Sequence, residues 1–154
     1  MRYIVIFLLL FTSCNNLKSK ENKKEIVNLN KSKKEDCIKD FDTFFDKFGK
    51  DSVFQKNKIK YPLRYLISDY DYEQEKDTVG VELIRKEENK YFDFTKDKDA
   101  INNEFDKYTI EIEKKSDKEI LYKHLGYDNG IFIIHKFVFI DGCWFLTEIE
   151  NKSS

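Results

Sequence analysis

Hydrophobic residues near residue 40 recur at helical spacing. The segment DCIKDFDTFFDKFGK places apolar side chains three or four residues apart and fills most of the intervening positions with Asp or Lys. This spacing predicts an amphipathic helix that is capped by Glu35 or Asp36 and ends at Gly49. Its expected apolar stripe consists of Ile38, Phe41, Phe44, Phe45 and Phe48.

A second short helix and an extended segment are expected next. In KDSVFQKNKI, Asp51 or Ser52 is suited to the N-cap position, and the apolar pair that follows can point inward. Pro62 cannot continue a helix because its ring blocks the helical hydrogen bond. The segment YPLRYLIS is therefore predicted to be extended.

The middle of the chain has the weakest periodicity. Residues 79–85 have the composition of a strand, and residues 97–105 indicate a short third helix capped by Asp97 or Asp99. The segment SDYDYEQEKD spaces acidic residues as the start of a calcium loop does, but it lacks the glycine and the closing glutamate of such a loop. A solvated loop is the favoured interpretation.

The last third of the chain alternates apolar and polar residues with a period of two. Short turns with Ser116-Asp117, Asn129-Gly130 and Asp141-Gly142 separate the alternating runs. Asn-Gly and Asp-Gly pairs tolerate the positive φ angles of tight hairpins. Four consecutive antiparallel strands are therefore predicted, at residues 106–115, 118–127, 130–140 and 143–150.

The strand at residues 131–140 is apolar on both faces, so both faces need a cover. The helix predicted after Asp36 can cover one face. A second subunit or the segment YFDF can cover the other.

Charge divides the chain into two parts. Residues 1–35 carry 8 Lys and Arg against 3 Glu, and residues 36–154 carry the remaining 20 Lys and Arg against 26 Asp and Glu. The Lys/Asn-rich segment at residues 15–34 has little to bury and is predicted to be a flexible tether. The acidic balance of residues 36–154 argues against nucleic acid as a partner.

The first fourteen residues have the pattern of an export signal. Arg2 precedes a nine-residue apolar run that is too short to span a bilayer, so residues 1–13 are predicted to be a signal peptide. The following Phe-Thr-Ser-Cys resembles a bacterial lipoprotein lipobox with Phe in place of the usual Leu. The resemblance implies lipid attachment at Cys14 and a membrane anchor for residues 14–35. Asn15 is not the aspartate of an inner-membrane retention signal, so the outer membrane of the bacterial cell envelope is the expected location. An ordinary secreted protein is the alternative.

Two cysteines remain in the predicted domain at residues 36–154. An oxidising envelope permits a disulfide between Cys37 and Cys143. Two buried thiols are an equally good interpretation, because nothing in the spacing shows that the two residues meet.

The order of predicted elements resembles the α+β roll of nuclear-transport-factor-2-like proteins, in which N-terminal helices pack on a curved antiparallel sheet. FDTFFDKFGKDSVFQKNKIKYPL and HKFVFIDGCWFLTEIEN also resemble the two ends of a family of uncharacterised bacterial lipoproteins, known as a domain of unknown function. The resemblance covers residues 36–151. It implies a fold rather than a reaction.

Such a roll encloses a cone whose open end often takes a small apolar ligand. Candidate lining residues are Tyr61, Tyr65, His135 and Trp144, although each of them is more typical of ordinary core or sheet packing. His124 is expected near the surface. No catalytic residue is assigned, and no cofactor or metal site is expected, since phosphate-loop, metal-ligand and nucleophile motifs are missing from the sequence.

The sequence therefore predicts a lipid-anchored envelope protein with one roll domain. It is expected to bind a small apolar ligand or peptide, or to form a homodimer through the outer sheet face. An isomerase or dehydratase is the alternative, and it requires a carboxylate within hydrogen-bonding reach of His135.

Overall fold

The computed structural model describes residues 37–71 and 73–154. The predicted signal peptide at residues 1–13, the lipid attachment at Cys14 and the tether at residues 14–35 lie outside these described residues. Within the described part, no helix is long and apolar enough to cross a membrane.

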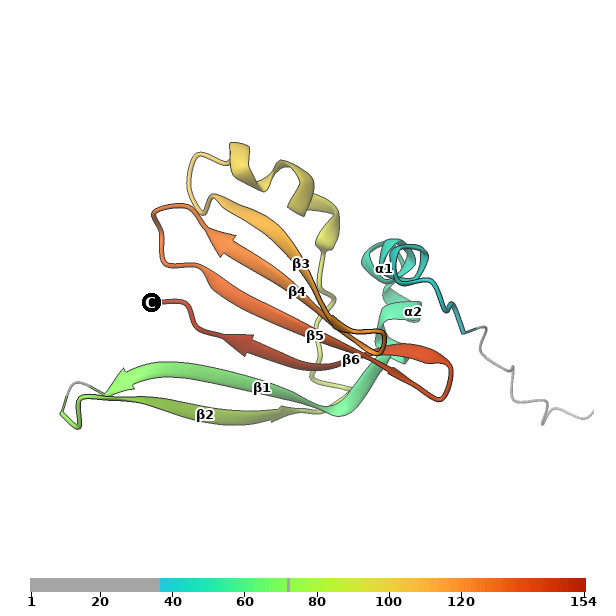
Figure 1. Ribbon diagram of the computed structural model, residues 1–154, viewed down its shortest axis with the longest axis horizontal. Coiled ribbons are helices and arrows are strands. Elements are labelled where there is room, and N and C mark those ends of the chain that lie inside the picture. The colour runs from blue at the N-terminus through green and yellow to red at the C-terminus, as the bar shows by residue number, and fades with distance from the viewer. Residues whose placement is uncertain (1–36, 72) are drawn as a thin grey trace, which may run out of the picture. The chain divides into compact units, whose positions relative to one another are not determined.

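Two consecutive helices open the described part (Figure 1). Helix α1 spans Phe41–Lys50 and α2 spans Ser52–Asn57. Asp40 caps α1 by accepting a hydrogen bond from the backbone N of Thr43 at 2.9 Å, so the predicted cap at Glu35 or Asp36 is wrong by several residues. Asp51, one of the two predicted candidates, caps α2 by accepting hydrogen bonds from the backbone N of Val53 and Phe54.

The late start of α1 has a tertiary cause. A disulfide joins Cys37 to Cys143, the first residue of the last strand. Two residues later, the carbonyl of Lys39 accepts a hydrogen bond from Trp144 Nε1 at 2.8 Å. These two links hold the chain against the sheet in a non-helical conformation until Asp40.

Six strands form one mixed sheet in the order β2-β1-β6-β5-β4-β3 (Figure 1). The last four strands form the predicted antiparallel meander, and β1 pairs antiparallel with β2. The sheet is not wholly antiparallel, because β1 lies parallel to β6. The strands are β1 (Ile59–Asp71), β2 (Lys76–Ile84), β3 (Tyr108–Ser116), β4 (Glu119–Gly126), β5 (Phe132–Ile140) and β6 (Cys143–Asn151).

An aromatic core joins α1 to the middle of the sheet. Phe137 of β5 is fully buried, and its ring centroid lies 5.3 Å from that of Phe48 and 5.5 Å from that of Phe41. Phe44 is also buried there, whereas Phe45 is only half-buried. Burial of aromatic side chains is the main source of stability in such an interface.

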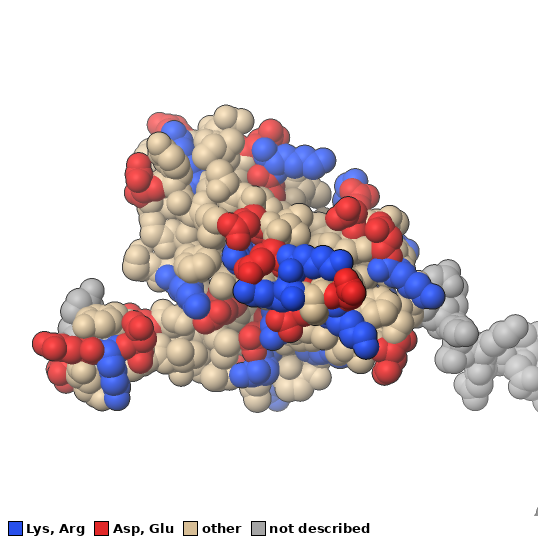
Figure 2. All heavy atoms as spheres, in the orientation of Figure 1, with Lys and Arg blue, Asp and Glu red and all other residues tan. Residues whose placement is uncertain are grey.

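The segment YFDF lies on the same sheet face as α1, not on the opposite one. Phe94 is buried against Phe45 and Phe48 of α1 and against Tyr122 of β4. Ion pairs between neighbouring strands are found on the sheet. Figure 2 shows basic and acidic side chains intermixed in the middle of the visible face. These pairs are Arg64–Glu148, Lys123–Glu111, Lys123–Glu113 and Lys136–Glu119.

The third helix is the 3-10 helix η1, which spans Phe94–Asn102. It begins three residues before the predicted position because Asp93 is its N-cap and accepts from the backbone N of Thr95 at 3.1 Å. Asp97, which the sequence suggested as a cap, is therefore inside the helix. Its side chain is buried against the sheet.

Candidate functional site

A pocket of about 540 Å³ opens between α1, η1 and β3. Phe41 and Phe45 from α1, Phe94 and Ile101 from η1, and Ile110 from β3 supply its apolar walls. The volume is in the range of small-molecule sites. The exposed side chains of Asp42, Asp46, Lys50 and Lys98 also line this pocket.

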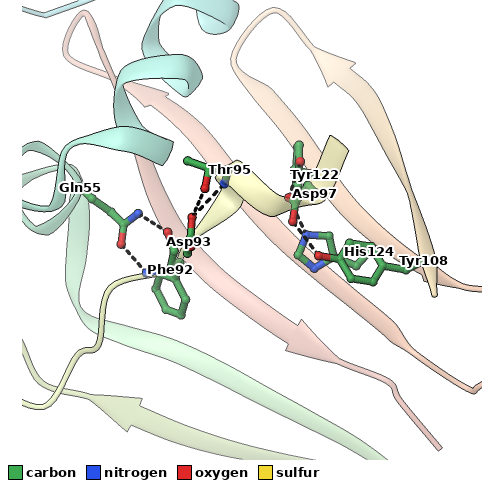
Figure 3. A network of polar contacts seen from close by, with 8 residues as sticks. All are labelled: Gln55, Phe92, Asp93, Thr95, Asp97, Tyr108, Tyr122 and His124. Atoms are coloured by element: carbon green, nitrogen blue, oxygen red, sulfur yellow. Dashed lines mark hydrogen bonds and ion pairs between the residues drawn. The ribbon is translucent and has the colours of Figure 1, made fainter. Parts of the chain in front are cut away.

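A buried carboxylate forms the polar end of the pocket. Asp97 Oδ1 accepts a hydrogen bond from the Tyr108 hydroxyl at 2.8 Å, and Oδ2 accepts from the Tyr122 hydroxyl at 2.6 Å (Figure 3). His124 Nε2 lies 3.1 Å from the same Oδ2. Asp97, Tyr108 and Tyr122 line the pocket, and His124 supports the carboxylate from within the sheet.

Strand alternation brings the three partners of Asp97 together. Tyr122 and His124 are two residues apart on β4, so both side chains point to the face that α1 covers. Tyr108 begins β3, the edge strand that pairs with β4. The phenol ring of Tyr108 packs 4.9 Å from the imidazole ring of His124.

A glutamine holds the segment that leads into η1. Gln55 of α2 is buried, and its Nε2 donates to the carbonyl of Phe92 at 2.9 Å while its Oε1 accepts from the backbone N of Phe92 at 2.8 Å (Figure 3). A Cβ added at Gly49 would lie 3.3 Å from the Cβ of Phe94. A glycine at this position therefore lets η1 approach α1 closely and brings Asp97 onto the sheet.

The polar end is arranged to hold a negative charge on Asp97. Burial raises the pKa of this carboxyl, but hydrogen bonds from His124, Tyr122 and Tyr108 outweigh burial and bring the pKa below its usual value. Burial and the hydrogen bond to Asp97 raise the pKa of Tyr108 to about 12, and the same causes raise that of Tyr122. Both phenols therefore keep their protons at neutral pH.

His135 lies beside this network without joining it. Its ring is buried 5.2 Å from that of His124, and its Nδ1 is buried without a hydrogen-bond partner. Burial and the neighbouring His124 lower the pKa of His135 to about 3, although Asp97 acts in the opposite direction. His135 is therefore a neutral core residue at physiological pH.

The pocket brings together none of the four residues predicted to line a ligand site. Trp144 is buried beside Phe41 and Phe139, and Tyr61 packs half-buried against the core. The Tyr65 hydroxyl accepts from Asn151 Nδ2 at 3.2 Å on β6. With no ligand bound, the role of these four residues in binding stays a prediction.

The residues that do form the polar end were missed by sequence reasoning. The His124 side chain is only 13% exposed, so the expectation of a surface position was wrong. Tyr122 and His124 share a parity on a predicted strand, which is the one local signal for their proximity. Asp97 is 25 residues from Tyr122 in the chain, and no spacing rule joins them.

The alternative function, that of an isomerase or dehydratase, required a carboxylate within hydrogen-bonding reach of His135. Among the hydrogen bonds of residues 37–71 and 73–154, none joins His135 to a carboxylate, and the buried Asp97 bonds to His124 instead. His124 does not line the pocket. The geometry therefore supplies a carboxylate-histidine pair in which the Asp97 carboxylate faces the pocket and the His124 imidazole supports it from within the sheet.

Comparison with known proteins identifies the fold but no family. No protein-family model and no curated protein matches the sequence. Among solved structures, a cystatin-like protein from Bacteroides caccae is 22% identical over 72% of this chain and 74% of its own, with a TM-score of 0.53. A nuclear-transport-factor-2-like protein from Bacteroides fragilis is 18% identical over 75% of this chain, with a TM-score of 0.49, and this chain spans only 47% of its length.

The structural likeness extends to the fold alone. Helices packed on a curved sheet are the arrangement that this chain shares with the cystatin-like protein. The chain has the nuclear-transport-factor-2-like α+β fold that was predicted from its sequence.

Proposed function

We propose that this protein binds a small amphipathic molecule in the pocket between α1, η1 and β3. The observation that carries the proposal is a pocket with aromatic and aliphatic walls and a buried, hydrogen-bonded carboxylate at its polar end. Ligand sites in proteins combine an apolar surface with a few fixed polar groups in this way.

The polar end is unusual for a purely structural feature. Asp97 is only 7% exposed, and a buried charge is costly unless several donors compensate it. Two of its donors, Tyr108 and Tyr122, also line the pocket. The arrangement keeps a charged group next to an apolar cavity, where it can contact a bound molecule.

Filling the pocket is expected to weaken the binding of a small apolar probe. In Ile112→Trp, the indole would occupy the pocket from the edge strand β3, where Ile112 is 53% exposed and can be enlarged without disturbing the core. The uncharged probe N-phenyl-1-naphthylamine should become fluorescent with the parent domain and bind at least about tenfold more weakly to the variant.

Val81→Trp is the matched control for this experiment. Val81 is 54% exposed on the edge strand β2 and does not line the pocket, so the same side chain is added at a similar exposure. The control should bind the probe as the parent does. Equal binding by all three proteins would contradict the proposal, because the probe would then be bound elsewhere.

We further propose that Cys14 anchors the protein in the bacterial cell envelope, in the outer membrane. The lipobox-like Phe-Thr-Ser-Cys and the preceding apolar run support this proposal. Full-length protein made in a bacterial host should lose residues 1–13, gain the mass of acyl chains and sediment with membranes. Two or more chains are needed for a stable anchor.

Cys14→Ala should remove the lipid mass and release the protein from the membrane fraction. Ser13→Ala keeps a small residue before the cysteine and should still be processed and retained. A mature parent protein without acyl chains would contradict the anchor and leave the pocket proposal untouched.

The homodimer through the outer sheet face stays a prediction. The ion pairs between neighbouring strands give the sheet a surface on which positive and negative charges alternate.

A further inference from the structure

The polar end of the pocket offers hydrogen-bond acceptors in place of donors. A tyrosine hydroxyl has one hydrogen. Tyr108 and Tyr122 both direct that hydrogen at Asp97, at 2.8 Å and 2.6 Å. The two phenols can therefore offer a ligand only the lone pairs of their oxygens.

The carboxylate of Asp97 strengthens this preference. It accepts three hydrogen bonds in total, from the two phenols and from His124, and each carboxylate oxygen has two acceptor positions. One position on Oδ1 is left after Tyr108. The carboxylate and both phenols line the same end of the pocket, so acceptor groups from η1, β3 and β4 converge there.

We infer that the ligand of this pocket has an apolar body and a head group that donates hydrogen bonds, such as a primary amine or a hydroxyl. This inference rests on the proposed function of the pocket. A carboxylate head would place its own lone pairs against those of Asp97 and both phenols, and it would lose its hydration without gaining a donor.

The cations that line the pocket do not reverse this selection. Lys50 Nζ is paired with Asp46 one helical turn away. Lys98 lines the pocket but is exposed to solvent, where a single charge contributes little to binding. Asp42 and Asp46 line the same region and balance the two lysines.

Three ligands with one carbon skeleton test the inference: phenylbutylamine, phenylbutanol and phenylbutanoate, each measured by displacement of N-phenyl-1-naphthylamine from the parent domain. The amine and the alcohol should displace the probe at concentrations at least about tenfold lower than the carboxylate requires. Such a ranking supports the inference.

Two variants test whether the polar end of the pocket causes the preference for the amine over the carboxylate. Asp97→Asn keeps the shape of the side chain but introduces an amide donor, so the preference for the amine over the carboxylate should fall below about threefold. Tyr108→Phe removes the phenol oxygen but opens a second acceptor position on Asp97 Oδ1, so the preference for the amine over the carboxylate should stay at about tenfold. If Asp97→Asn does not fold, the ranking of the three ligands with the parent protein decides.

The outcomes separate this inference from the function on which it rests. In one contrary outcome the probe binds and the carboxylate displaces it at the same concentration as the amine does. In another, the probe binds and none of the three ligands displaces it. Either result overturns the donor-head inference, and the pocket remains a binding site. If Lys98→Gln then loses binding of the carboxylate ligand, the head group of that ligand lies at Lys98 and not at Asp97. If the probe itself does not bind, both proposals fail.

Discussion

Reduction of the Cys37–Cys143 disulfide is expected to lower the free energy of unfolding by about 4 kcal/mol. The two residues are 106 positions apart, so the bridge closes nearly the whole domain into one loop. In the chain-entropy description, closing a loop of about 100 residues stabilises the folded state by about 4.7 kcal/mol, and removal of native disulfides typically costs about 2 to 5 kcal/mol.

Urea unfolding of the domain at residues 36–154 with and without a reducing agent measures this effect. The double variant Cys37→Ala/Cys143→Ala should resemble the reduced parent and should not respond to the reductant. Cys143 is buried, so its replacement also leaves a small cavity, which the reduced parent does not have. A parent protein whose unfolding is the same in both conditions would contradict the prediction.

The same experiment reports on how α1 is held. The disulfide and the hydrogen bond from Trp144 Nε1 to the Lys39 carbonyl link the sheet to the chain just before α1. Reduction leaves only the second one. We therefore expect hydrogen exchange in Phe41–Lys50 to accelerate more than in β5 when the bridge is opened.

His135 is expected to make the domain less stable as the pH falls below 6.5. In the unfolded chain the imidazole takes up a proton near its ordinary pKa of 6.5, whereas burial keeps the folded pKa at about 3. Below pH 6.5 the unfolded state thus binds more protons than the folded state, and stability falls. Each pH unit lowers the free energy of unfolding by up to about 1.4 kcal/mol, so the decrease between pH 6.5 and pH 5 is at most about 2 kcal/mol.

His135→Leu should remove most of this pH dependence. Leucine is apolar and similar in volume, and it eliminates the buried Nδ1 that has no hydrogen-bond partner. The comparison is made between pH 7 and pH 5, above the range in which Asp97, whose pKa is lowered, takes up its proton. Unfolding curves with the same pH dependence in the parent and in His135→Leu would show that His135 is protonated in the folded protein.

Local pattern was sufficient for most of the elements of this fold. The period of two and the turn residues of the last third predicted β3 to β6 within about two residues, because each hairpin is determined by adjacent sequence. The helix α2 and its cap at Asp51 followed from the same kind of local evidence. The resemblance to the nuclear-transport-factor-2-like roll assembled these elements correctly.

Contacts between distant segments decided the rest. The parallel pairing of β1 with β6 depends on where the chain between β2 and β3 crosses the sheet, and no turn motif encodes that path. The start of α1 was displaced by two links to residues more than 100 positions away. Helix boundaries are sensitive to such contacts because the intrinsic preference of each residue is weak.

The sequence by itself determined the helices, the meander and the presence of an aromatic core, since spacing along the chain specifies which side chains share a face. The tertiary structure alone decided that Asp97, Tyr108, Tyr122 and His124 meet at one end of a pocket. Their proximity requires η1 to dock between α1 and β3, which depends on the close approach at Gly49 and the hydrogen bonds of Gln55. Such docking is a property of the packed chain and leaves no periodic trace in the sequence.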